Sequence, residues 1–559
     1  MSDDRHLRTS RRDERARRSG RSAALVASGI LLSRISGVGR EIGLRAGLGT
    51  GTAAADAFAA ALIIPKLLQN LLGEGSLSAS FIPVYARLLE DGEEKEAGRV
   101  AGAVFSVLAV LTAALVLVGL FLARPLATIV APGISGDERD LIVDLLRIMS
   151  TGIGFIVLAA WCLGVLNAHR RFFLSYIAPV LWNAAIIAGL IVASVQDWVQ
   201  ADIAEAAAWG VLVGGLLQFL VQLPLVLRLV PSLRLGFGRG SMHFRAVLRR
   251  FVPAVSGRGV VTLSTYLDVA LASLLATGAI AALSSAQVLY LMPISAFALS
   301  VAAAELPELS RGMDTERRAA IQLRLGLERI SLFLVFSAVA FLAIGETVVA
   351  ALYERGSTNA DDVMLIWLVL AAYSLGMPAS GASRLLQNAR YAEGDVSGPA
   401  RIAALRVAIA AVVGVVVMFQ LDRYAIVGGE IQRMGDLPAF TPVAKDVRTD
   451  GTLRMGAVGL AVGASVAAWV ELVWLQRRVR RGLPMAPLVR WSLWRLAPAG
   501  AAAAVICIVG RLTLDSVAPI LVAPVVLAVA GLIYLAIANV SGNRAAVELM
   551  SPILRRISR

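Results

Sequence analysis

Residues 100–123 read VAGAVFSVLAVLTAALVLVGLFLA, a run of 24 residues in which no side chain is charged. A helix of this length rises about 36 Å, which is enough to cross a hydrocarbon core of about 30 Å. Similar apolar runs recur along nearly the whole chain, separated by short polar stretches. They are too long for the strands of a membrane barrel. The sequence therefore predicts an all-α protein that crosses a membrane many times.

The composition agrees with a membrane protein and excludes several other classes. Hydrophobic residues make up 58% of the 559 residues and the mean hydropathy is +0.74, more than a soluble domain could bury. The net charge of +14 comes from short basic clusters between apolar runs, so it does not indicate binding to nucleic acid. The cysteines, Cys162 and Cys507, lie in apolar runs, and the three histidines lie in basic connections. We therefore expect no disulfide, metal cluster or cofactor.

The distribution of basic residues predicts the topology. Connections on the amino-terminal side hold 36 of the 53 lysines and arginines, connections on the opposite side hold 10, and seven lie within helices. This bias predicts that both termini lie in the cytoplasm and that the loop at 422–454 is external. We place about 14 transmembrane helices at 23–48, 52–85, 100–123, 141–166, 172–195, 203–227, 251–276, 279–307, 330–353, 361–389, 400–421, 455–476, 496–510 and 516–540.

A weak internal repeat suggests two lobes of six helices. Residues Leu48–Ala54 are echoed by Leu275–Ala281, and Ile64-Pro65 by Met292-Pro293, at offsets of 227 and 228 residues. An even number of helices in each copy makes the two lobes parallel. The alternative is a chance recurrence of small residues. We expect a basic cytoplasmic tail at 1–22, an N-lobe at 23–230, a C-lobe at 248–480, a helix pair at 490–541 and a cytoplasmic tail at 542–559.

The first predicted helix contains Ser33-Arg-Ile-Ser-Gly-Val-Gly-Arg-Glu41. Arg34 falls near the middle of the hydrocarbon core, where a charged side chain costs about 2.5 to 3.5 kcal/mol on insertion scales. It should therefore face a wet cavity or a counter-ion. Arg40 lies roughly 9 Å further along the helix, where snorkelling to the external interface is plausible, and a functional role is favoured for it as for Arg34.

The second predicted helix contains Asp56, Pro65, Lys66 and the triplet Gly73-Glu74-Gly75, which an ordinary spanning helix would avoid. Pro65 removes a backbone donor, and the two glycines permit a sharp bend, so we expect this helix to be broken. Lys66 and the two carboxylates are candidates for substrate binding. The alternative is that they form a buried ion pair without a role in transport.

Three further charged residues lie in later apolar runs: Arg258 and Asp268 in the seventh helix and Arg384 in the tenth. Asp268 is a candidate site for a coupling cation, or it neutralises an arginine. The excess of cationic charge inside the helices predicts an anionic substrate group. Because the guanidinium group matches the oxygens of a phosphate, a diphosphate is favoured over a single carboxylate.

Five motifs are distinctive: Ser33–Glu41, Ala55–Phe58, Gly73–Gly75, Phe81–Val84, and Ser383–Asn388 with Tyr391–Asp395. They resemble the MurJ (MviN) family of lipid II flippases, within the multidrug, oligosaccharidyl-lipid and polysaccharide exporter superfamily. The resemblance implies two lobes around a central cationic cavity, a groove for a polyprenyl tail at the last two helices, and alternating access without ATP hydrolysis. It also implies that Arg34, Arg40 and Asp56 bind the diphosphate-linked lipid. Transport would be coupled to the membrane potential or to a monovalent cation.

The chain departs from this family at two positions. Gln69 stands where members commonly carry a basic residue, and Val288 stands where many carry an arginine. Lys66, which lies three residues before Gln69 and on the same helical face, is expected to face the cavity and replace one charge. Arg258 or Arg384 could replace the other.

Two alternatives to a lipid II flippase follow from these departures. One is an exporter of another polyprenyl-linked saccharide or of a drug. The other is a membrane scaffold that transports nothing. A membrane glycosyltransferase would need a carboxylate-rich loop at the membrane surface, and the sequence contains no convincing example.

Overall fold

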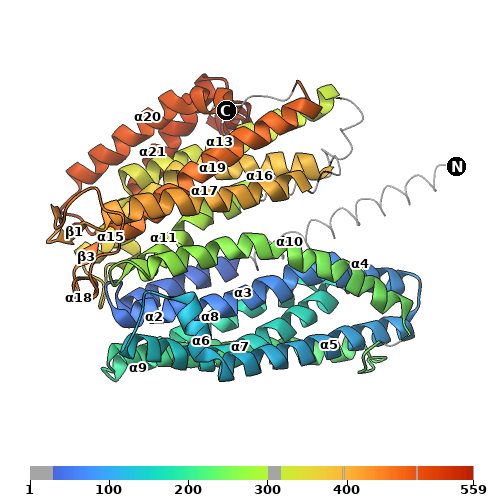
Figure 1. Ribbon diagram of the computed structural model, residues 1–559. Coiled ribbons are helices and arrows are strands. Elements are labelled where there is room, and N and C mark those ends of the chain that lie inside the picture. The colour runs from blue at the N-terminus through green and yellow to red at the C-terminus, as the bar shows by residue number, and fades with distance from the viewer. Residues whose placement is uncertain are drawn as a thin grey trace. The chain divides into compact units, whose positions relative to one another are not determined.

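The computed structural model describes residues 29, 31–238, 240–299, 316–392, 395, 397–485 and 489–557, which are mostly helical (Figure 1). Within these residues 11 helices are long and apolar enough to cross a membrane. A bent pair, α15 (Ala360–Leu375) and α16 (Met377–Ala392), makes a twelfth if it is one span. The predicted all-α, multi-spanning fold class is confirmed.

The two remaining predicted spans include residues that are not fully described. The span at 23–48 begins before the described residues, which show a helix over 31–48. The span at 251–276 corresponds to α10 (Met242–Ala272), in which the side chains of residues 256–265 lie outside the description. The predicted tail at 1–22 also lies outside the described residues.

The first of two compact units comprises the described residues up to Leu48 together with residues 57–130 and 134–262. It includes most of α2 (Ala53–Ala61), the first part of α10, and α3 (Ile63–Leu72), α4 (Glu74–Glu90), α5 (Glu94–Phe121), α6 (Ala123–Val130), α7 (Asp137–Ala168), α8 (Phe172–Val195) and α9 (Gln200–Leu229).

Within this unit helix α7 packs against α4, α5 and α9. In its most apolar stretch 78% of the residues are buried, compared with 22% in α5. A helix that is apolar on every face and surrounded by other helices belongs in a core, whereas the exposed apolar face of α5 suits contact with lipid. The indole N–H of Trp161 on α7 donates to the carbonyl oxygen of Ala101 on α5, at 3.1 Å.

The predicted break in the second span is confirmed, and it occurs twice. Helix α2 ends at Ala61 and α3 begins at Ile63, so Pro65 falls in the first turn of α3, where its missing N–H is tolerated. The second break is at Gly73, between α3 and α4. A Cβ atom at this position would lie 2.1 Å from the carbonyl oxygen of Gln69. A side chain would therefore not fit at this junction between α3 and α4.

The second unit comprises residues 49–56, residues 131–133 and the described residues from Leu263 onward. Helix α19 packs on α15, α16 and α17, and α20 packs on α13 and α21. The unit contains α11 (Ala279–Pro293), the π-helical turn η1 (Ile294–Leu299), α13 (Glu316–Ala343), α14 (Gly345–Tyr353), α15, α16, α17 (Ser397–Leu421), α18 (Lys445–Arg448), α19 (Gly456–Gly482), α20 (Val489–Thr513), α21 (Pro519–Val540) and α22 (Arg544–Ile557).

Residues 422–454, which we call the flap, form a small sheet between α17 and α19. Strands β1 (Tyr424–Val427), β2 (Glu430–Arg433) and β3 (Leu453–Arg454) are antiparallel in the order β2-β1-β3. The turn between β1 and β2 is Gly428-Gly429, with φ of +62° and +78°, which suits a two-residue hairpin turn. The carboxylate of Asp361 on α15 accepts both glycine N–H groups, at 3.0 and 2.6 Å. This contact fixes the flap to the start of α15.

Candidate substrate site

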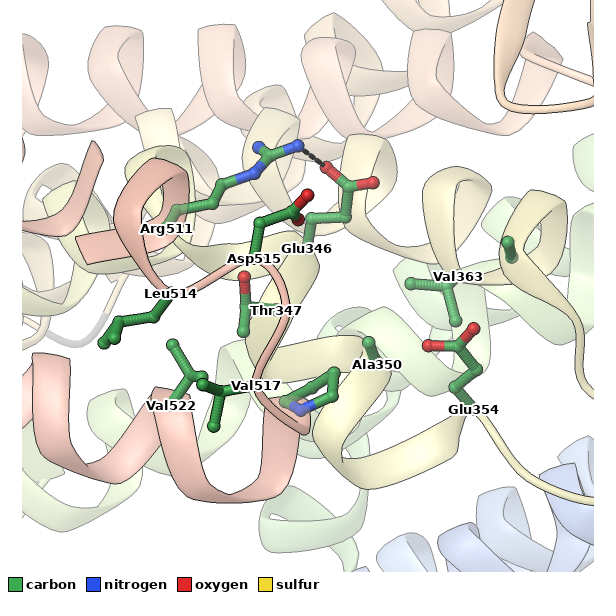
Figure 2. Close-up of a pocket in the computed structure, with 12 residues that line it drawn as sticks. Glu346, Thr347, Ala350, Glu354, Val363, Arg511, Leu514, Asp515, Val517 and Val522 are labelled. Atoms are coloured by element: carbon green, nitrogen blue, oxygen red, sulfur yellow. Dashed lines mark ion pairs between the residues drawn. The ribbon is translucent and has the colours of Figure 1, made fainter. Parts of the chain in front are cut away.

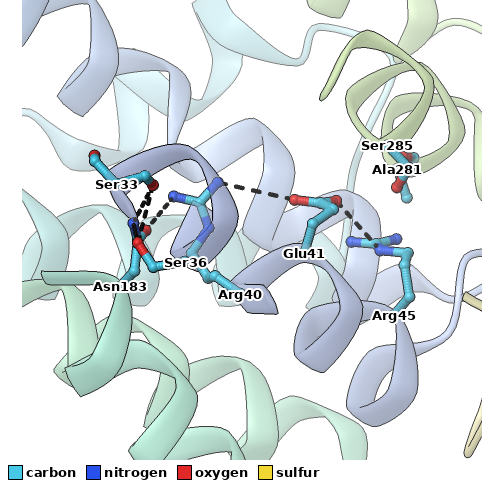
Figure 3. A network of polar contacts seen from close by, with 8 residues as sticks. All are labelled: Ser33, Ser36, Arg40, Glu41, Arg45, Asn183, Ala281 and Ser285. Atoms are coloured by element: carbon cyan, nitrogen blue, oxygen red, sulfur yellow. Dashed lines mark hydrogen bonds and ion pairs between the residues drawn. The ribbon is translucent and has the colours of Figure 1, made fainter. Parts of the chain in front are cut away.

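The best defined polar cluster of the first unit lies on its first helix and on α8 (Figure 3). Arg40 is only 9% exposed and donates to the side-chain oxygen of Asn183 at 3.2 Å. Its guanidinium group also lies over the ring of Trp182, 5.1 Å from the centroid. The amide of Asn183 donates in turn to the hydroxyl of Ser36, at 2.9 Å. Asn183 and Trp182 thus hold Arg40 inside the unit, and its role in substrate binding stays a prediction.

Glu41 connects Arg40 with a second buried arginine. Its carboxylate lies 3.9 Å from the guanidinium group of Arg40 and 3.5 Å from that of Arg45. Glu41 is 4% exposed and Arg45 is 1% exposed. Two buried arginines thus share the carboxylate of Glu41 on one helix.

Arg34 lies on the same helix but is exposed on the surface of the first unit. No carboxylate among the described residues forms an ion pair with it. Its neighbours Leu31 and Ile35 are also exposed, at 59% and 56%. Arg34 is therefore accessible to a ligand, and its role in substrate binding stays a prediction.

Asp56 has a clear role in the second unit. Its two carboxylate oxygens accept the N–H groups of Gly278 and Ala281, at 2.8 and 2.7 Å. These groups form the start of α11, where backbone N–H groups lack partners within the helix and a negative charge is favourable. Asp56 is 3% exposed. The geometry favours a helix cap over direct contact with a substrate.

A second carboxylate, that of Asp362, makes a contact similar to that of Asp56. Gly51, the counterpart of Gly278 in the predicted repeat, donates its N–H to the carboxylate of Asp362, at 2.9 Å. A Cβ atom at Gly278, where φ is +96°, would lie 3.0 Å from the Cα of Gly51. The repeated glycine turns therefore pack closely on each other, and a carboxylate holds the amide of each.

The structure places the remaining candidates of the second span on α3 and α4. Lys66 on α3 is exposed and forms no ion pair with the described residues. Glu74 is the first residue of α4, but its side chain lies outside the description. Gln69 lines a cavity of the first unit, with a volume of about 470 Å³. The substrate roles of Lys66 and Glu74 stay predictions.

The candidates of the second unit lie near a network of paired polar side chains. The carboxylate of Glu471 accepts from Arg406 at 2.8 Å and from Gln387 at 2.9 Å. Asp268 on α10 interacts electrostatically with Arg406. No group of three or more metal-ligating side chains occurs in the described part of the chain. A cation site at Asp268 stays a prediction.

The other predicted basic groups are less informative. Arg384 is partly buried on α16, and the side chain of Arg258 on α10 lies outside the description. Val288 is partly buried on α11, next to Gln287, whose amide donates to the hydroxyl of Tyr373 at 3.1 Å. Replacement of the charge missing at Val288 by Arg258 or Arg384 stays a prediction.

A second pocket, of about 210 Å³, lies between α14, α15 and the turn joining α20 to α21 (Figure 2). Its charged residues are Glu346, Glu354, Asp515 and Arg511, and Arg511 is paired with Glu346. The pocket is negative overall, which disfavours a phosphate group. We therefore do not assign the diphosphate to it.

The connection between α16 and α17 is held by an ionic cluster. The carboxylate of Asp395 accepts from Arg390 at 2.8 Å, from the N–H of Gly398 at 2.8 Å and from Arg478 at 3.0 Å. Hydrogen bonds from Arg390, and then from Gly398, hold the pKa of Asp395 well below its usual range. This part of the motif Tyr391–Asp395 thus fixes helix ends.

Sequence reasoning missed three members of the buried cluster: Glu41 as a partner, Arg45 and Asn183. Glu41 and Arg45 are four residues apart, a spacing that places them on one helical face, so this pair could have been found. Asn183 is 143 residues from Arg40 and lies in an ordinary apolar run, so no local pattern indicated it.

Comparisons with known proteins point to one family. A family model described as "Lipid II flippase MurJ" matches residues 46–430. A protein of Rhizobium tropici named "Probable lipid II flippase MurJ" is 33% identical over 395 residues, covering 69% of this chain and 73% of that protein. The lipid II flippase MurJ of Burkholderia cenocepacia is 32% identical over 415 residues, covering 72% and 78%.

Two solved structures show the same fold. A lipid II flippase MurJ in an inward closed conformation matches with a TM-score of 0.72 at 20% identity, covering 95% of this chain and all of that chain. An inward-facing multidrug transporter of the MATE family matches with a TM-score of 0.58 at 15% identity, covering 82% and 98%. With the family match over most of its length, this chain belongs to the MurJ family of lipid II flippases.

Proposed function

We propose that the chain moves lipid II, a polyprenyl-diphosphate-linked cell-wall precursor, from the inner to the outer leaflet of the bacterial cytoplasmic membrane. It would do so by alternating access and would catalyse no covalent reaction. Family membership supports the substrate, and the arginines of the first helix are the observation that carries the mechanism. Residues 31–48 contain three arginines and one acidic residue, Glu41. Such an excess of guanidinium groups inside a membrane suits a diphosphate.

Arg34 and Arg40 would have different tasks in this transport. Arg34 is exposed and unpaired within the described residues, so it is available to meet the diphosphate directly. Arg40 is held by Asn183 and Glu41, so its position is fixed before the substrate arrives. A preorganised charge loses little conformational freedom on binding. Coupling to the membrane potential, or to a monovalent cation near Asp268, would give the transport its direction.

Depletion of the protein in growing cells tests the function. Lipid II at the outer leaflet should fall when the chain is depleted and return when the wild type is supplied. If Arg34 binds the diphosphate, Arg34→Lys should fail nearly as badly as Arg34→Ala, because lysine keeps the charge but loses the bidentate geometry. Full activity of Arg34→Ala at normal abundance would contradict this role. Unchanged lipid II exposure after depletion would contradict the function itself.

We also propose that both termini are cytoplasmic and that the flap is external, because the charge bias predicts it. Single cysteines placed at exposed flap positions such as Glu430 or Asp436 should react with a membrane-impermeant maleimide in intact cells. The native cysteines, Cys162 and Cys507, are both buried, which keeps the background low. Labelling that requires permeabilised cells would overturn this topology.

A further inference from the structure

We propose that the connection between α9 and α10 is a re-entrant segment of the inner leaflet, where it binds the head group of an anionic phospholipid. This connection, which we call the connecting loop, comprises residues 230–241, of which residue 239 lies outside the described residues. The inference goes beyond the proposed transport, and it uses the proposed topology only to say which leaflet is meant. The contacts that carry it all lie within the first unit.

The connecting loop runs down along α5 and then returns. Three of its groups donate to positions of α5 that lie successively further from the start of that helix: the hydroxyl of Ser232 to the carbonyl oxygen of Glu94 at 2.7 Å, the N–H of Arg234 to the carbonyl oxygen of Gly98 at 3.4 Å, and the N–H of Gly236 to the hydroxyl of Ser106 at 3.1 Å. The hydroxyl of Ser241 then donates to the carboxylate of Glu96, at 2.7 Å. The loop therefore enters and leaves on the same side of the membrane.

Two glycines of α5 make this close approach possible. A Cβ atom at Gly98 would lie 2.4 Å from the carbonyl oxygen of Ser232, and a Cβ atom at Gly102 would lie 2.0 Å from the carbonyl oxygen of Arg234. Because both of these oxygens belong to the backbone, they could not give way without moving the loop. The connecting loop thus has a fitted place on α5, close to the helix backbone.

The tip of the connecting loop reaches the depth of the lipid tails. Ser106 lies seven residues beyond Arg99, the last charged residue before the apolar run of α5, which is about 10 Å along the helix. Since water is absent at this depth, the N–H of Gly236 needs an acceptor from the protein, and Ser106 supplies it. The side chains on either side of Gly236, those of Leu235 and Phe237, are 68% and 55% exposed. Apolar side chains exposed at this depth suit acyl chains, which a soluble partner protein could not replace.

The charge around the connecting loop favours an anionic head group. Residues 228–250 contain six arginines and no acidic residue. Arg234, Arg245 and Arg249 are exposed, and no described carboxylate forms an ion pair with them. Guanidinium groups match the oxygens of a phosphate, and each basic residue beside a span strengthens binding to anionic lipid about fivefold. An apolar tip beside unpaired arginines therefore fits the tail and the head group of one phospholipid.

Spin labelling measures the depth of the connecting loop. A nitroxide would be attached to Phe237→Cys in the full-length chain in liposomes, or to Leu235→Cys if the first variant folds poorly; the native cysteines are buried. The label should collide more often with oxygen, which concentrates in lipid, than with a water-soluble nickel complex. The control is Asp91→Cys, an exposed position in the connection between α4 and α5, where collisions with nickel should dominate. Equal access of nickel to both labels would overturn the inference, because the loop would then lie in water.

Native mass spectrometry of the purified full-length chain tests the head group. The chain would be titrated with phosphatidylglycerol and, separately, with phosphatidylcholine. The double variant Arg234→Gln/Arg245→Gln should bind phosphatidylglycerol roughly tenfold more weakly or worse, and phosphatidylcholine within about twofold of the wild type. The control double variant is Arg170→Gln/Arg171→Gln, an equally exposed pair in the connection between α7 and α8, and it should match the wild type. Unchanged binding of phosphatidylglycerol to the first variant, or an equal loss for both lipids, would overturn the inference.

Discussion

In the first helix, three arginines accompany one glutamate, whereas in the second unit Glu471 is matched by Arg406 and by the amide of Gln387. Both places are poor in solvent: Glu41 is 4% exposed and Glu471 is 2% exposed. The two places differ in the number of basic groups relative to carboxylates. A carboxylate whose partners satisfy it holds helices together, whereas arginines that outnumber the carboxylates of their own helix suit an anionic ligand. We therefore expect buried charge to have a structural use in the second unit and a functional use in the first.

The largest effect that we predict is on stability, at Glu471. Glu471→Ala leaves Arg406 and Gln387 without their common partner, and breaking such a buried pair typically costs about 3 to 5 kcal/mol. We expect low abundance in the membrane and a clearly lower melting temperature in detergent. Glu471→Gln keeps the shape and two hydrogen-bonding groups, so it should lose less. Normal melting together with lost transport would instead place Glu471 on the functional side of the comparison.

The next effect is on activity, at Arg40. Arg40→Ala leaves Glu41 paired with Arg45, so the buried cluster becomes neutral and the fold should survive. Transport in a lipid II accessibility assay should fall by about 10-fold or more, because a fixed charge-assisted contact is lost. Asn183→Ala removes the partner that positions Arg40 but keeps the charge, so it should give a smaller loss. Wild-type activity of both variants would show that the cluster is only structural.

The sequence was sufficient for the fold because hydrophobic runs in a bilayer are a strong signal. The predicted span at 172–195 coincides with α8, and the predicted break near Gly73 is present. The sequence predicted the site less well, because the contacts of a side chain depend on which helices pack against each other. Arg40 is held by Asn183 on α8, and Asp56 accepts the N–H groups of Gly278 and Ala281 at the start of α11. Neither contact has a local signature in the sequence.

The flap contains a buried carboxylate, Asp422, whose charge is not fully compensated by its neighbours. This carboxylate predicts a pH dependence of stability. Asp422 is 1% exposed, and burial raises its pKa to about 6, although Arg454, Arg423 and Arg448 partly oppose this shift. The native protein therefore takes up a proton at a higher pH than the unfolded chain does. Stability should rise as the pH falls from 7 to about 4, by roughly 2 kcal/mol.

Melting curves of the purified protein between pH 4.5 and 7.5 check this prediction, with Asp422→Asn as the comparison. The variant should show a flatter pH dependence than the wild type and a higher melting temperature at pH 7. Parallel curves for both proteins would show that Asp422 keeps an ordinary pKa, and that the arginines around it balance its charge as Arg406 balances that of Glu471.

The smallest effect concerns Asp361, whose carboxylate holds the hairpin turn of the flap through the N–H groups of Gly428 and Gly429. Asp361→Ala removes both bonds, but the turn is exposed, so water can replace them and the loss should be about 1 kcal/mol. Amide hydrogen exchange over residues 424–433 should become roughly fivefold faster, while transport stays unchanged. Glu430→Ala, a neighbouring exposed charge, is the control. Unchanged exchange in Asp361→Ala would show that pairing of β1 with β3 holds the flap by itself, whereas a loss of transport would move this carboxylate from the structural to the functional group of charges.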